Sequence, residues 1–325
     1  MMRMMLVVGL TSLVACGSGP GQMMTAPDAP DGPMYIPGFD PPPVQDGYTR
    51  FVTSPIPNIK PGDNVEYCQW VAPASATAQD VLDFTGAQSA AGHHAVLYAT
   101  TETYFDVGET HECTTNDMLS ISFIGGIGGE GIGGSATKLP DGLFFRLPAG
   151  QALMANTHWL NATDTTVEGQ AAIDVKFVPA DDSRAIADIF ANNGDKFAIP
   201  PGEATKYDVS CTLPQDMNFG MVSNHMHNSG TSAYSELKHP DGTSTMLQND
   251  AVWGADEQFN PVFTRYSLAA PLVAHAGDTY HTHCEWQNNT SKTLMFPDEM
   301  CDGIGFYFPA TKGQIACSNG QWPSN

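Results

Sequence analysis

The sequence predicts an all-β protein built from two tandem antiparallel β-sandwiches, and three observations support this fold class. The 325-residue chain has 32 Gly and 24 Pro, with frequent Thr, Val and aromatic residues, a composition that favours strands and turns over helices. Short strand-like runs alternate with turn signals such as Pro61–Asp63 and Pro140–Gly142. The chain is also long enough for two domains that each bury a core.

The first residues of the chain are typical of an export signal. Arg3 supplies a positive charge and Met4–Val14 a short apolar stretch, so residues 1–15 are predicted to be a signal peptide. Its end, LVAC at 13–16, resembles the bacterial lipobox, in which the peptide is cut before the cysteine and the cysteine is lipidated. We therefore expect an exported protein that Cys16 anchors to a bacterial membrane, facing the periplasm or the cell surface. The alternative is a plain secretory signal with a chance cysteine.

Two domains are predicted to follow a tether. Residues 16–47 are rich in Gly, Pro and Asp and lack periodicity, so we expect a disordered tether behind the lipidated cysteine. Domains at 48–180 and 181–325 follow, with the boundary at Pro179–Asp182, where a strand ends in a polar turn. No apolar run after residue 15 is long enough to be a transmembrane helix.

Strand-like runs fill both domains. They include RFVTSPI, NVEYCQWVA, HHAVLYATTE and ALMANTHWL in the first, and ATKYDVSCTL, NFGMVSNHMH and DTYHTHCEWQN in the second. One short helix is predicted over Ala78–Phe84, with Thr77 as its N-cap and Gly86 just past its end. Gly125–Gly134 is predicted to be a flexible loop, not a phosphate cradle, because no Lys-Ser/Thr follows at P-loop spacing. Beyond this stretch the sequence shows no internal repeat.

Charge and cysteine content narrow the functional classes. Lys and Arg number 13 against 35 Asp and Glu, and the net charge of -22 disfavours nucleic-acid binding because it repels phosphate. If Cys16 carries lipid, six of the seven cysteines remain, an even number that predicts three disulfides in an oxidising compartment. Their connectivity stays open on these grounds. A CxxC zinc site is disfavoured because no cysteine pair has that spacing.

The stretch SNHMHNSG contains the first candidate ligand pair. His225 and His227 lie two apart, so in a strand both rings face the same side, while Met226 points the other way, toward the core. Imidazole suits copper, zinc, iron and nickel alike, so the pair does not choose the metal. Two exposed strand histidines without a metal are the alternative.

Two further histidine sites precede this pair. His93 and His94 are adjacent, and adjacent residues of a regular strand point to opposite faces. Both can bind one metal only if the backbone is irregular there, which the preceding Gly92 permits. His158, in ANTHWL, is a lone histidine, and taken by itself a structural role is the commoner one.

Met300 is unusual for a core methionine because it lies beside Cys301 in the polar stretch FPDEMCDG. Its thioether is a soft ligand that favours Cu(I); the alternative is a gap-filling side chain packed against a disulfide. A second HxH pair, His281 and His283, competes with the first. For this pair, and for His111, His239 and His275, the sequence offers no set of partners, so structural roles are expected.

Taken in order, these motifs resemble the copper type II, ascorbate-dependent monooxygenases, the family of peptidylglycine α-hydroxylating monooxygenase and dopamine β-monooxygenase. The matching pattern is His-His at 93–94, Thr-His-Trp at 157–159, His-Met-His at 225–227 and Asp-Glu-Met-Cys at 298–301. The segments PDGLFFRLPAG and IPPGEATKYDVSC also look like parts of this family. The resemblance covers residues 48–318.

The resemblance implies two jelly-roll-like β-sandwiches with a cleft between them and one copper ion in each. By family analogy His93, His94 and His158 would bind the electron-supplying copper, and His225, His227 and Met300 the copper at which oxygen is activated. Ascorbate or an equivalent reductant would supply electrons, and one oxygen atom would be inserted into an activated C–H bond of a small organic substrate. The disulfides would be Cys68–Cys113, Cys211–Cys317 and Cys284–Cys301.

Departures from the family bear on the substrate. Where peptide-amidating enzymes have an arginine before the HxH, and an asparagine and a tyrosine after the methionine, this chain has Ser223, Asp302 and Ile304. A peptide carboxylate is therefore a poor fit, and the acidic Asp298, Glu299 and Asp302 suggest a cationic amine instead.

Three functional classes compete for this sequence. The first is a monomeric copper-dependent monooxygenase whose partners are a small-molecule substrate, O2 and an electron donor, and which meets the membrane only through its lipid anchor. The second is a lipid-anchored copper-binding or copper-handling protein without turnover, which needs the same ligands. The third is a cell-surface adhesion module with incidental histidines, which the presence of all six ligand candidates disfavours.

Overall fold

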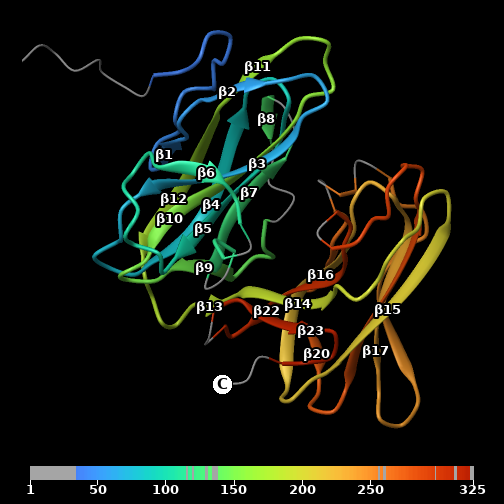
Figure 1. Cartoon of the computed structure of the whole chain (residues 1–325). Helices are drawn as coiled ribbons and strands as arrows, with labels where there is room; N and C mark the ends of the chain where they lie inside the picture. Colours follow the sequence, from blue (N-terminus) through green and yellow to red (C-terminus); the bar gives the residue numbers. More distant parts are fainter. Residues whose placement is uncertain are drawn as a thin grey trace, which may run out of the picture. The chain divides into compact units, whose positions relative to one another are not determined.

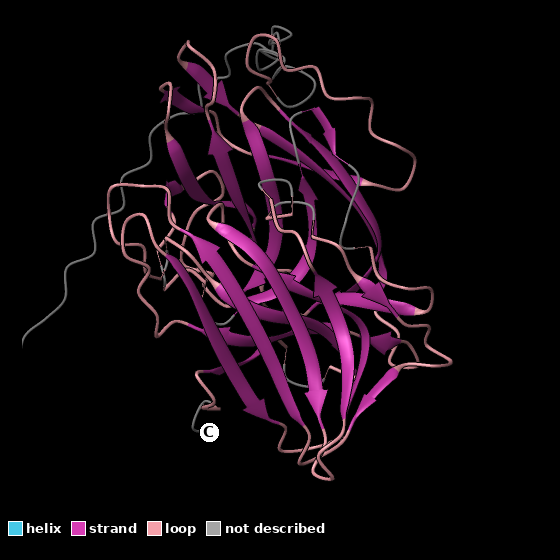
Figure 2. Cartoon of the chain, turned by 90° about the vertical axis from the view of Figure 1, so that its right-hand side faces the viewer, coloured by secondary structure: helices cyan, strands magenta, loops and turns pink. Residues whose placement is uncertain are grey.

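The structure of the protein is a computed structural model, and its regular secondary structure, where described, consists of strands (Figures 1 and 2). The structure describes residues 34–114, 116–118, 121–128, 131–133, 138–254, 257–258, 261–296, 298–310 and 313–322. These residues contain no helix, so the predicted all-β class is confirmed. Accordingly, no helix in these ranges is long and apolar enough to cross a membrane. The predicted signal peptide and Cys16 lie outside the described residues.

The first half of the chain forms two larger sheets and one small one, drawn blue to yellow-green in Figure 1. One sheet has the order β1 (Thr49–Val52), β12 (Ala171–Pro179), β4 (Gln79–Gln88), β9 (Leu143–Leu147) and β13 (Ala185–Ile186), with β8 (Gly131–Gly133) on β4. The other has the order β6 (Thr110–Glu112), β3 (Asn64–Ala72), β10 (Ala152–Leu160), β5 (Gly92–Thr100) and β7 (Ile121–Gly128). The small sheet pairs β2 (Ile56–Ile59) with β11 (Val167–Gly169).

The second half repeats the two-sheet arrangement. One sheet has the order β19 (Thr264–Arg265), β16 (Met217–His225), β22 (Cys301–Phe308), β14 (Asp188–Gly194) and β23 (Ile315–Ser318), with β20 (Leu272–Ala274) on β16. The other has the order β15 (Ala204–Thr212), β21 (Thr279–Gln287), β17 (Gly230–Lys238) and β18 (Ser244–Asp250). Buried residues alternate with half-buried ones over Ala233–Leu237 of β17, as expected for a strand with one face on a core.

The two halves share apolar contacts. Met221 and Phe306 of the second half belong to the core cluster of the first half. The ring of Phe306 lies 5.6 Å from that of Phe123 and 5.4 Å from that of Phe145. Strand β13 lies beyond the expected boundary at residue 180 and still pairs with β9. Residues Tyr35–Asn325 accordingly form one compact unit.

Two predictions of local structure are wrong. Of the helix expected over Ala78–Phe84, residues 79–84 are instead part of β4, which pairs with β12 on one side and with β8 and β9 on the other. These ladders override the local capping signals. The loop expected over Gly125–Gly134 begins within β7 and includes β8. A Cβ atom at Gly125 would lie 2.5 Å from the ring of Phe84, so glycine serves close packing here rather than flexibility.

The predicted tether ends earlier than residue 47. Phe39 is buried and packs with Ala87 and Ala172 on the first sheet. The backbone N–H of Ile36 donates to the side-chain oxygen of Gln170, at 2.9 Å. The expectation of disorder is therefore wrong for this segment, because its aromatic side chain finds an apolar surface to cover.

A repeated loop, missed in the sequence, occurs in both halves. Asn161 donates to the carbonyls of Ile59 and Thr165, each at 2.8 Å, while its own side-chain oxygen accepts from the backbone of Thr163. Asn288 makes the same set of bonds to the carbonyls of Ile199 and Lys292 and from the backbone of Thr290. A buried Trp stands two residues before each Asn, at Trp159 and Trp286. The residues that the two loops share are too sparse to stand out in the sequence as an internal repeat.

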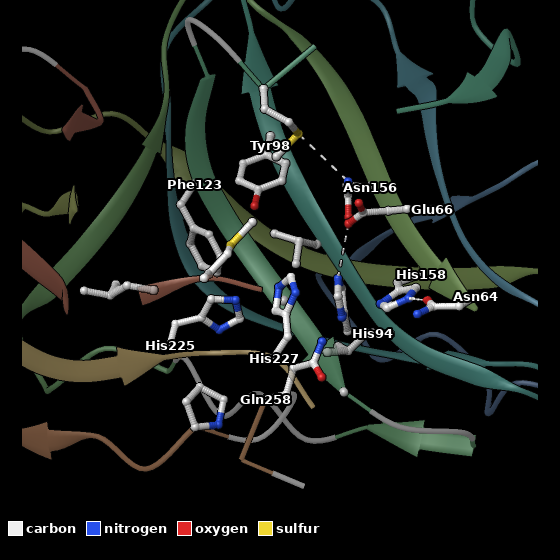
Figure 3. Close-up of a pocket in the computed structure, with 18 of the residues that line it drawn as sticks. Asn64, Glu66, His94, Tyr98, Phe123, Asn156, His158, His225, His227 and Gln258 are labelled. Carbon is white, nitrogen blue, oxygen red and sulfur yellow. Dashed lines mark hydrogen bonds and ion pairs between the residues drawn. The ribbon is translucent and has the colours of Figure 1, made fainter. Parts of the chain in front are cut away.

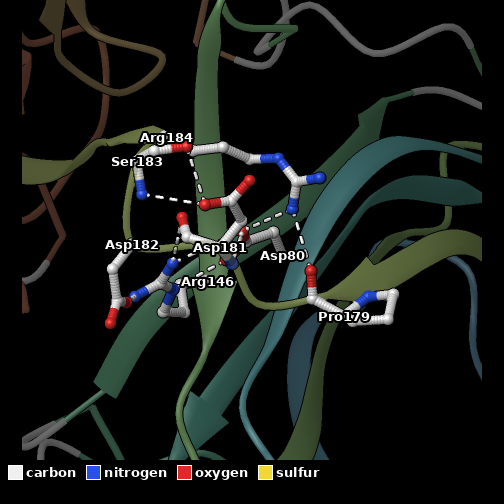
Figure 4. Close-up of polar contacts among 7 residues, drawn as sticks. All are labelled: Asp80, Arg146, Pro179, Asp181, Asp182, Ser183 and Arg184. Atoms are coloured by element: carbon white, nitrogen blue, oxygen red, sulfur yellow. Dashed lines mark hydrogen bonds and ion pairs between the residues drawn. The ribbon is translucent and has the colours of Figure 1, made fainter.

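A buried carboxylate fixes the chain just after β12 (Figure 4). Asp80, whose side chain is fully buried, accepts from Arg146 at 2.6 Å and from Arg184 at 2.8 Å. The backbone N–H of Asp181 donates to the same carboxylate. Burial by itself raises the pKa of Asp80, but the hydrogen bonds from the two arginines outweigh it, and the net pKa lies below the ordinary 3.8.

We expect Asp80→Asn to lower the free energy of unfolding by about 3 kcal/mol at pH 7, because two partly buried arginines lose their counter-charge. A folded-state pKa below 3.8 means that the ionised carboxylate stabilises the fold above that pH, and that this contribution is lost as the pH falls through the folded pKa. Urea unfolding at pH 7 and near pH 3 should therefore show the wild-type advantage shrinking in acid. Asp182→Asn, at the exposed partner of Arg146, is the control and should change little.

Candidate metal centres

Strands β5 and β10 bring the first group of histidines together. His94 and His158 are direct cross-strand partners, and Glu66 on β3 faces His158 from the other side. The rings of His94 and His158 lie 5.0 Å apart. In an antiparallel ladder, paired residues project from the same face, which explains why His94, His158 and Glu66 converge although they are distant in sequence.

An irregularity in β5 adds the third imidazole. His94 pairs with His158 and Gly92 with Trp159, so His93 is left over between two successive pairs. Such a bulge re-aims a side chain. A Cβ atom at Gly92 would lie 2.4 Å from that of Gln88, so only glycine fits at the base of the bulge. The condition set out from the sequence, an irregular backbone next to Gly92, is confirmed.

The three rings offer one compact set of donors. Each of His93, His94 and His158 presents a ring nitrogen, and these nitrogens lie within 4.8 Å of one another. Burial, followed by the charges of His158 and His94, lowers the pKa of His93 to about 3. Burial and the charge of His94 lower that of His158 to about 4. Both rings are therefore neutral near pH 7, the form that binds a metal.

The second histidine group, His225 and His227, lies at the end of β16, whose last residue is His225. His225 and His227 have ring centroids 5.3 Å apart, and Met226 between them is fully buried in the core, as predicted. Burial and the charge of His227 lower the pKa of His225 to about 3. The Nδ1 atom of His227 lies 3.1 Å from the carbonyl oxygen of Asp298, which orients the ring and leaves Nε2 for a metal.

Glu299 holds the backbone that follows this pair. Its buried carboxylate accepts from the backbone N–H of His227 at 2.9 Å and from that of Ser229 at 2.6 Å. It also accepts from the indole of Trp286 at 3.1 Å. The residue next to Met300 thus positions His227, a role that the sequence did not reveal.

Met300 is placed by covalent and sheet constraints. It precedes β22, which pairs with β16 so that Asp302 lies opposite His225. The adjoining Cys301 is bonded to Cys284 on β21. Met300, His225 and His227 all line one pocket.

This pocket contains side chains from both candidate metal groups (Figure 3). It encloses about 590 Å³. His94 and His158 line it from the first half, and His225, His227 and Met300 from the second. The remaining lining is largely apolar, with a few polar groups, and comprises Asn64, Glu66, Val96, Tyr98, Met118, Phe123, Gly126, Ile127, Gly128, Asn156, Gln258, Pro261, Asp298 and Ile304.

Two polar residues of the pocket were missed in the sequence. Asn64 bonds through its side-chain oxygen to Nε2 of His158, and a carboxylate oxygen of Glu66 lies 3.8 Å from Nε2 of His94. Both belong to β3, on the face that meets His158. The alternation of polar and apolar residues in NVEYC predicts that Asn64 and Glu66 share one face of the strand. The local sequence does not show that the neighbouring strand on this face contains His158.

Two of the three acidic residues singled out for substrate binding, Asp298 and Glu299, have partners within the protein. The Glu299 carboxylate is engaged by the three donors described above, and that of Asp298 is paired with Lys292 at 2.8 Å. Asp302 does not line the pocket, whereas Ile304 does. Ser223 is buried and donates to the carbonyl of Val262. Glu66 also lines the pocket, beside His94, and half of its side chain is exposed.

The disulfide connectivity expected from the resemblance is confirmed. The bonded pairs are Cys68–Cys113, Cys211–Cys317 and Cys284–Cys301. The first joins β3 to the segment that follows β6, and the last joins β21 to the start of β22. A disulfide therefore restrains β3, which pairs with the strand of His158, and another restrains β22, which pairs with the strand of His225.

The donor sets fit copper. Three imidazoles accommodate both Cu(I) and Cu(II), and two imidazoles with a thioether favour Cu(I), since a soft ligand prefers the softer ion. The neutral state of the buried rings removes the competition from protons.

Comparison with known proteins does not indicate a function for this chain. No family model and no curated protein sequence matches the chain. Similar solved structures include PNGase F, a glycosylasparaginase from Flavobacterium meningosepticum, at 12% identity and TM-score 0.32, covering 86% of this chain and 98% of that one. Another is the major capsid protein P2 from bacteriophage PM2, at 7% identity and TM-score 0.30, covering 82% and 99% respectively. At such TM-scores neither likeness carries an argument about function.

Proposed function

We propose that this protein is a copper-dependent monooxygenase that hydroxylates an activated C–H bond of a small organic substrate, using O2 and ascorbate or another one-electron donor. The observation that carries the proposal is a single pocket lined by members of a three-imidazole group and by a group of two imidazoles and a thioether.

The chain's own residues would divide the work between the two groups. His93, His94 and His158 would hold the copper that receives electrons, because three imidazoles tolerate both oxidation states. His225, His227 and Met300 would hold the copper whose reduced state meets O2, since a thioether stabilises Cu(I). Bound copper supplies the one-electron chemistry with O2 that no side chain can provide.

Other residues would orient the ligands and the substrate. Asn64 fixes the His158 ring, and the Asp298 carbonyl fixes that of His227, so little reorganisation is needed on metal binding. Apolar side chains such as Val96 and Phe123 exclude water from part of the pocket.

The pocket also favours a class of substrate. Its apolar lining suits an aliphatic or aromatic body, and the carboxylate of Glu66 suits a cationic group, so we propose a small amine. Glu66, rather than the acidic residues near Met300, would make this contact.

The test combines copper analysis with oxygen uptake on the purified chain. We expect two copper ions per chain and ascorbate-driven O2 uptake that rises when an amine is added, and rises less with a neutral analogue of equal size. His275→Ala, at a surface histidine outside the pocket, is the matched control and should leave both readouts unchanged.

Three outcomes would decide against parts of the proposal. Binding of no more than one copper contradicts the two-site arrangement. Two coppers without substrate-dependent uptake, across a panel of amines and neutral compounds, would favour a copper-handling protein. Equal turnover of amines and neutral analogues would contradict the amine preference alone.

We further propose that the protein works outside the cytoplasm as a monomer, lipid-anchored through Cys16 to a bacterial membrane. The three disulfides support an oxidising compartment. Metabolic labelling with a palmitate analogue, lost in Cys16→Ala, tests the anchor.

A further inference from the structure

A chain of buried hydrogen bonds crosses the second sandwich behind His225. Asn224, which precedes His225 on β16, is fully buried, and its side-chain N–H donates to Oδ2 of Asp250 at the end of β18, at 2.7 Å. The hydroxyl of Ser235 on β17 donates to the side-chain oxygen of Asn224, at 2.6 Å. Adjacent residues of a strand face opposite sides, so Asn224 lies inside the sandwich while His225 lines the pocket.

Asp250 also accepts a hydrogen bond from its other side. Its Oδ1 atom accepts from Nε2 of Gln248, at 2.6 Å, and Oε1 of Gln248 accepts from the hydroxyl of Thr264 on β19, also at 2.6 Å. An ionised carboxylate can only accept, so both amides must turn their N–H groups toward it. The single carboxylate of Asp250 therefore fixes the orientation of the Asn224 and Gln248 side chains.

The rest of the chain of hydrogen bonds is oriented by the same carboxylate. Ser235 has a single proton, which it donates to Asn224, so the hydroxyl of Thr282 is the donor in its 3.0 Å contact with Ser235. Thr282 in turn accepts from the side-chain N–H of Asn192, at 3.1 Å. All of these donors thus point along the chain toward Asp250. Hydrogen bonds aligned in this way polarise and strengthen one another in a buried environment.

This network restrains two parts of the pocket wall. Through Asn224 it holds the end of β16, whose last residue is His225. Through Thr264 it holds the start of β19, and the segment between β18 and β19 contributes Gln258 and Pro261 to the pocket. Both parts therefore depend on one carboxylate that does not itself line the pocket.

We propose that Asp250 is a positioning residue for the histidine pair of the second half, because the network that ends on its carboxylate fixes His225 for copper binding. Asn224 is joined to His225 through the backbone and to Asp250 through its side chain. Metal affinity depends on ligands that are held close to their binding geometry by a surrounding shell. This role rests on the proposed function in one respect, that the pair binds copper, and is independent of turnover.

The test exchanges the two side chains of this pair. Asn224→Asp alone sets two carboxylates against each other, and Asp250→Asn alone sets an amide N–H group against one of the two N–H donors. Each should lower the copper affinity of the histidine pair about 10-fold or more, the effect typical of losing an outer-shell partner. The double variant keeps every hydrogen bond, because the amide at position 250 donates to the carboxylate at position 224 while its oxygen still accepts from Gln248. It should therefore restore the affinity to within a few-fold of wild type.

Cu(I) affinity at the pair is measured by competition with a chelator, in chains that also carry His94→Ala and His158→Ala so that the other group does not bind. The affinity of the three-histidine group, measured in chains that carry His225→Ala and His227→Ala, should be the same with and without each change. A purely structural role would instead weaken both groups together. Asn249→Asp, which adds a carboxylate on the exposed side of β18, is the charge control and should bind like wild type.

Equal affinity in wild type and both single variants would overturn the role of Asp250. A double variant that regains wild-type stability in urea without regaining copper affinity would overturn it too, and this comparison decides the matter where a single variant does not fold. Absence of copper binding by the wild-type pair would contradict both this role and the proposed function. Copper affinity that follows the network in a protein without substrate-dependent O2 uptake would contradict the proposed function alone.

Discussion

Met300→Ile is expected to lower substrate-dependent oxygen uptake by about 100-fold or more. Isoleucine is of similar size and apolar, so the pocket wall is retained while the thioether is lost. Loss of an outer-shell partner of a ligand already costs about 10- to 100-fold in metal affinity or activity, and removal of the ligand itself should lie at or beyond that upper end. The measurement is ascorbate-driven O2 uptake together with copper content.

The copper content separates a ligand from a packing residue. The three-histidine group should keep its ion in Met300→Ile, so the variant should still hold about one copper. Met295→Ile, at an exposed methionine in the same segment, is the control and should behave like wild type. Uptake by Met300→Ile within a few-fold of wild type would show that the thioether does not serve the reaction.

Glu299→Ala is expected to lower the free energy of unfolding by about 3 kcal/mol or more, because each buried donor left without an acceptor costs about 1–3 kcal/mol. Three donors lose their acceptor here: the backbone N–H groups of His227 and Ser229 and the indole of Trp286. The same change releases the backbone next to the HxH pair, so copper affinity at that group should fall by about 10- to 100-fold. Urea unfolding and copper titration measure the two effects.

Asp298→Ala is the matched control for Glu299→Ala. Its carboxylate lies at the surface in an exposed pair with Lys292, and such pairs contribute about 0–1 kcal/mol. Its carbonyl, which orients His227, is unchanged by the substitution. Equal destabilisation in the two variants would mean that the buried carboxylate of Glu299 has no special role.

The sequence predicted the parts of the candidate site that depend on local spacing. A spacing of two residues predicted that His225 and His227 lie close together and that Met226 enters the core, although β16 ends at His225 and His227 lies beyond it. The need for a backbone irregularity at His93 could also be stated in advance. The disulfide pairing followed from the family resemblance, not from the spacing of the cysteines.

The sequence could not predict which strands lie next to one another. Asn64 and Glu66 reach His158 and His94 only because β3 pairs with β10, about ninety residues later. Asp208 likewise meets His283 only through the pairing of β15 with β21. The helix predicted over Ala78–Phe84 failed for the same reason, since its partners on both sides are non-local.

The loops around Asn161 and Asn288 repeat the same hydrogen bonds in the two halves, but the histidines near them are not repeated. His158 stands directly before the repeated tryptophan in the first half, and the equivalent position in the second half is Glu285. The pocket histidine His225 instead lies on β16, in the other sheet of its sandwich. If both groups hold copper as proposed, this asymmetry would place the two ions in different surroundings, so they would not be equivalent.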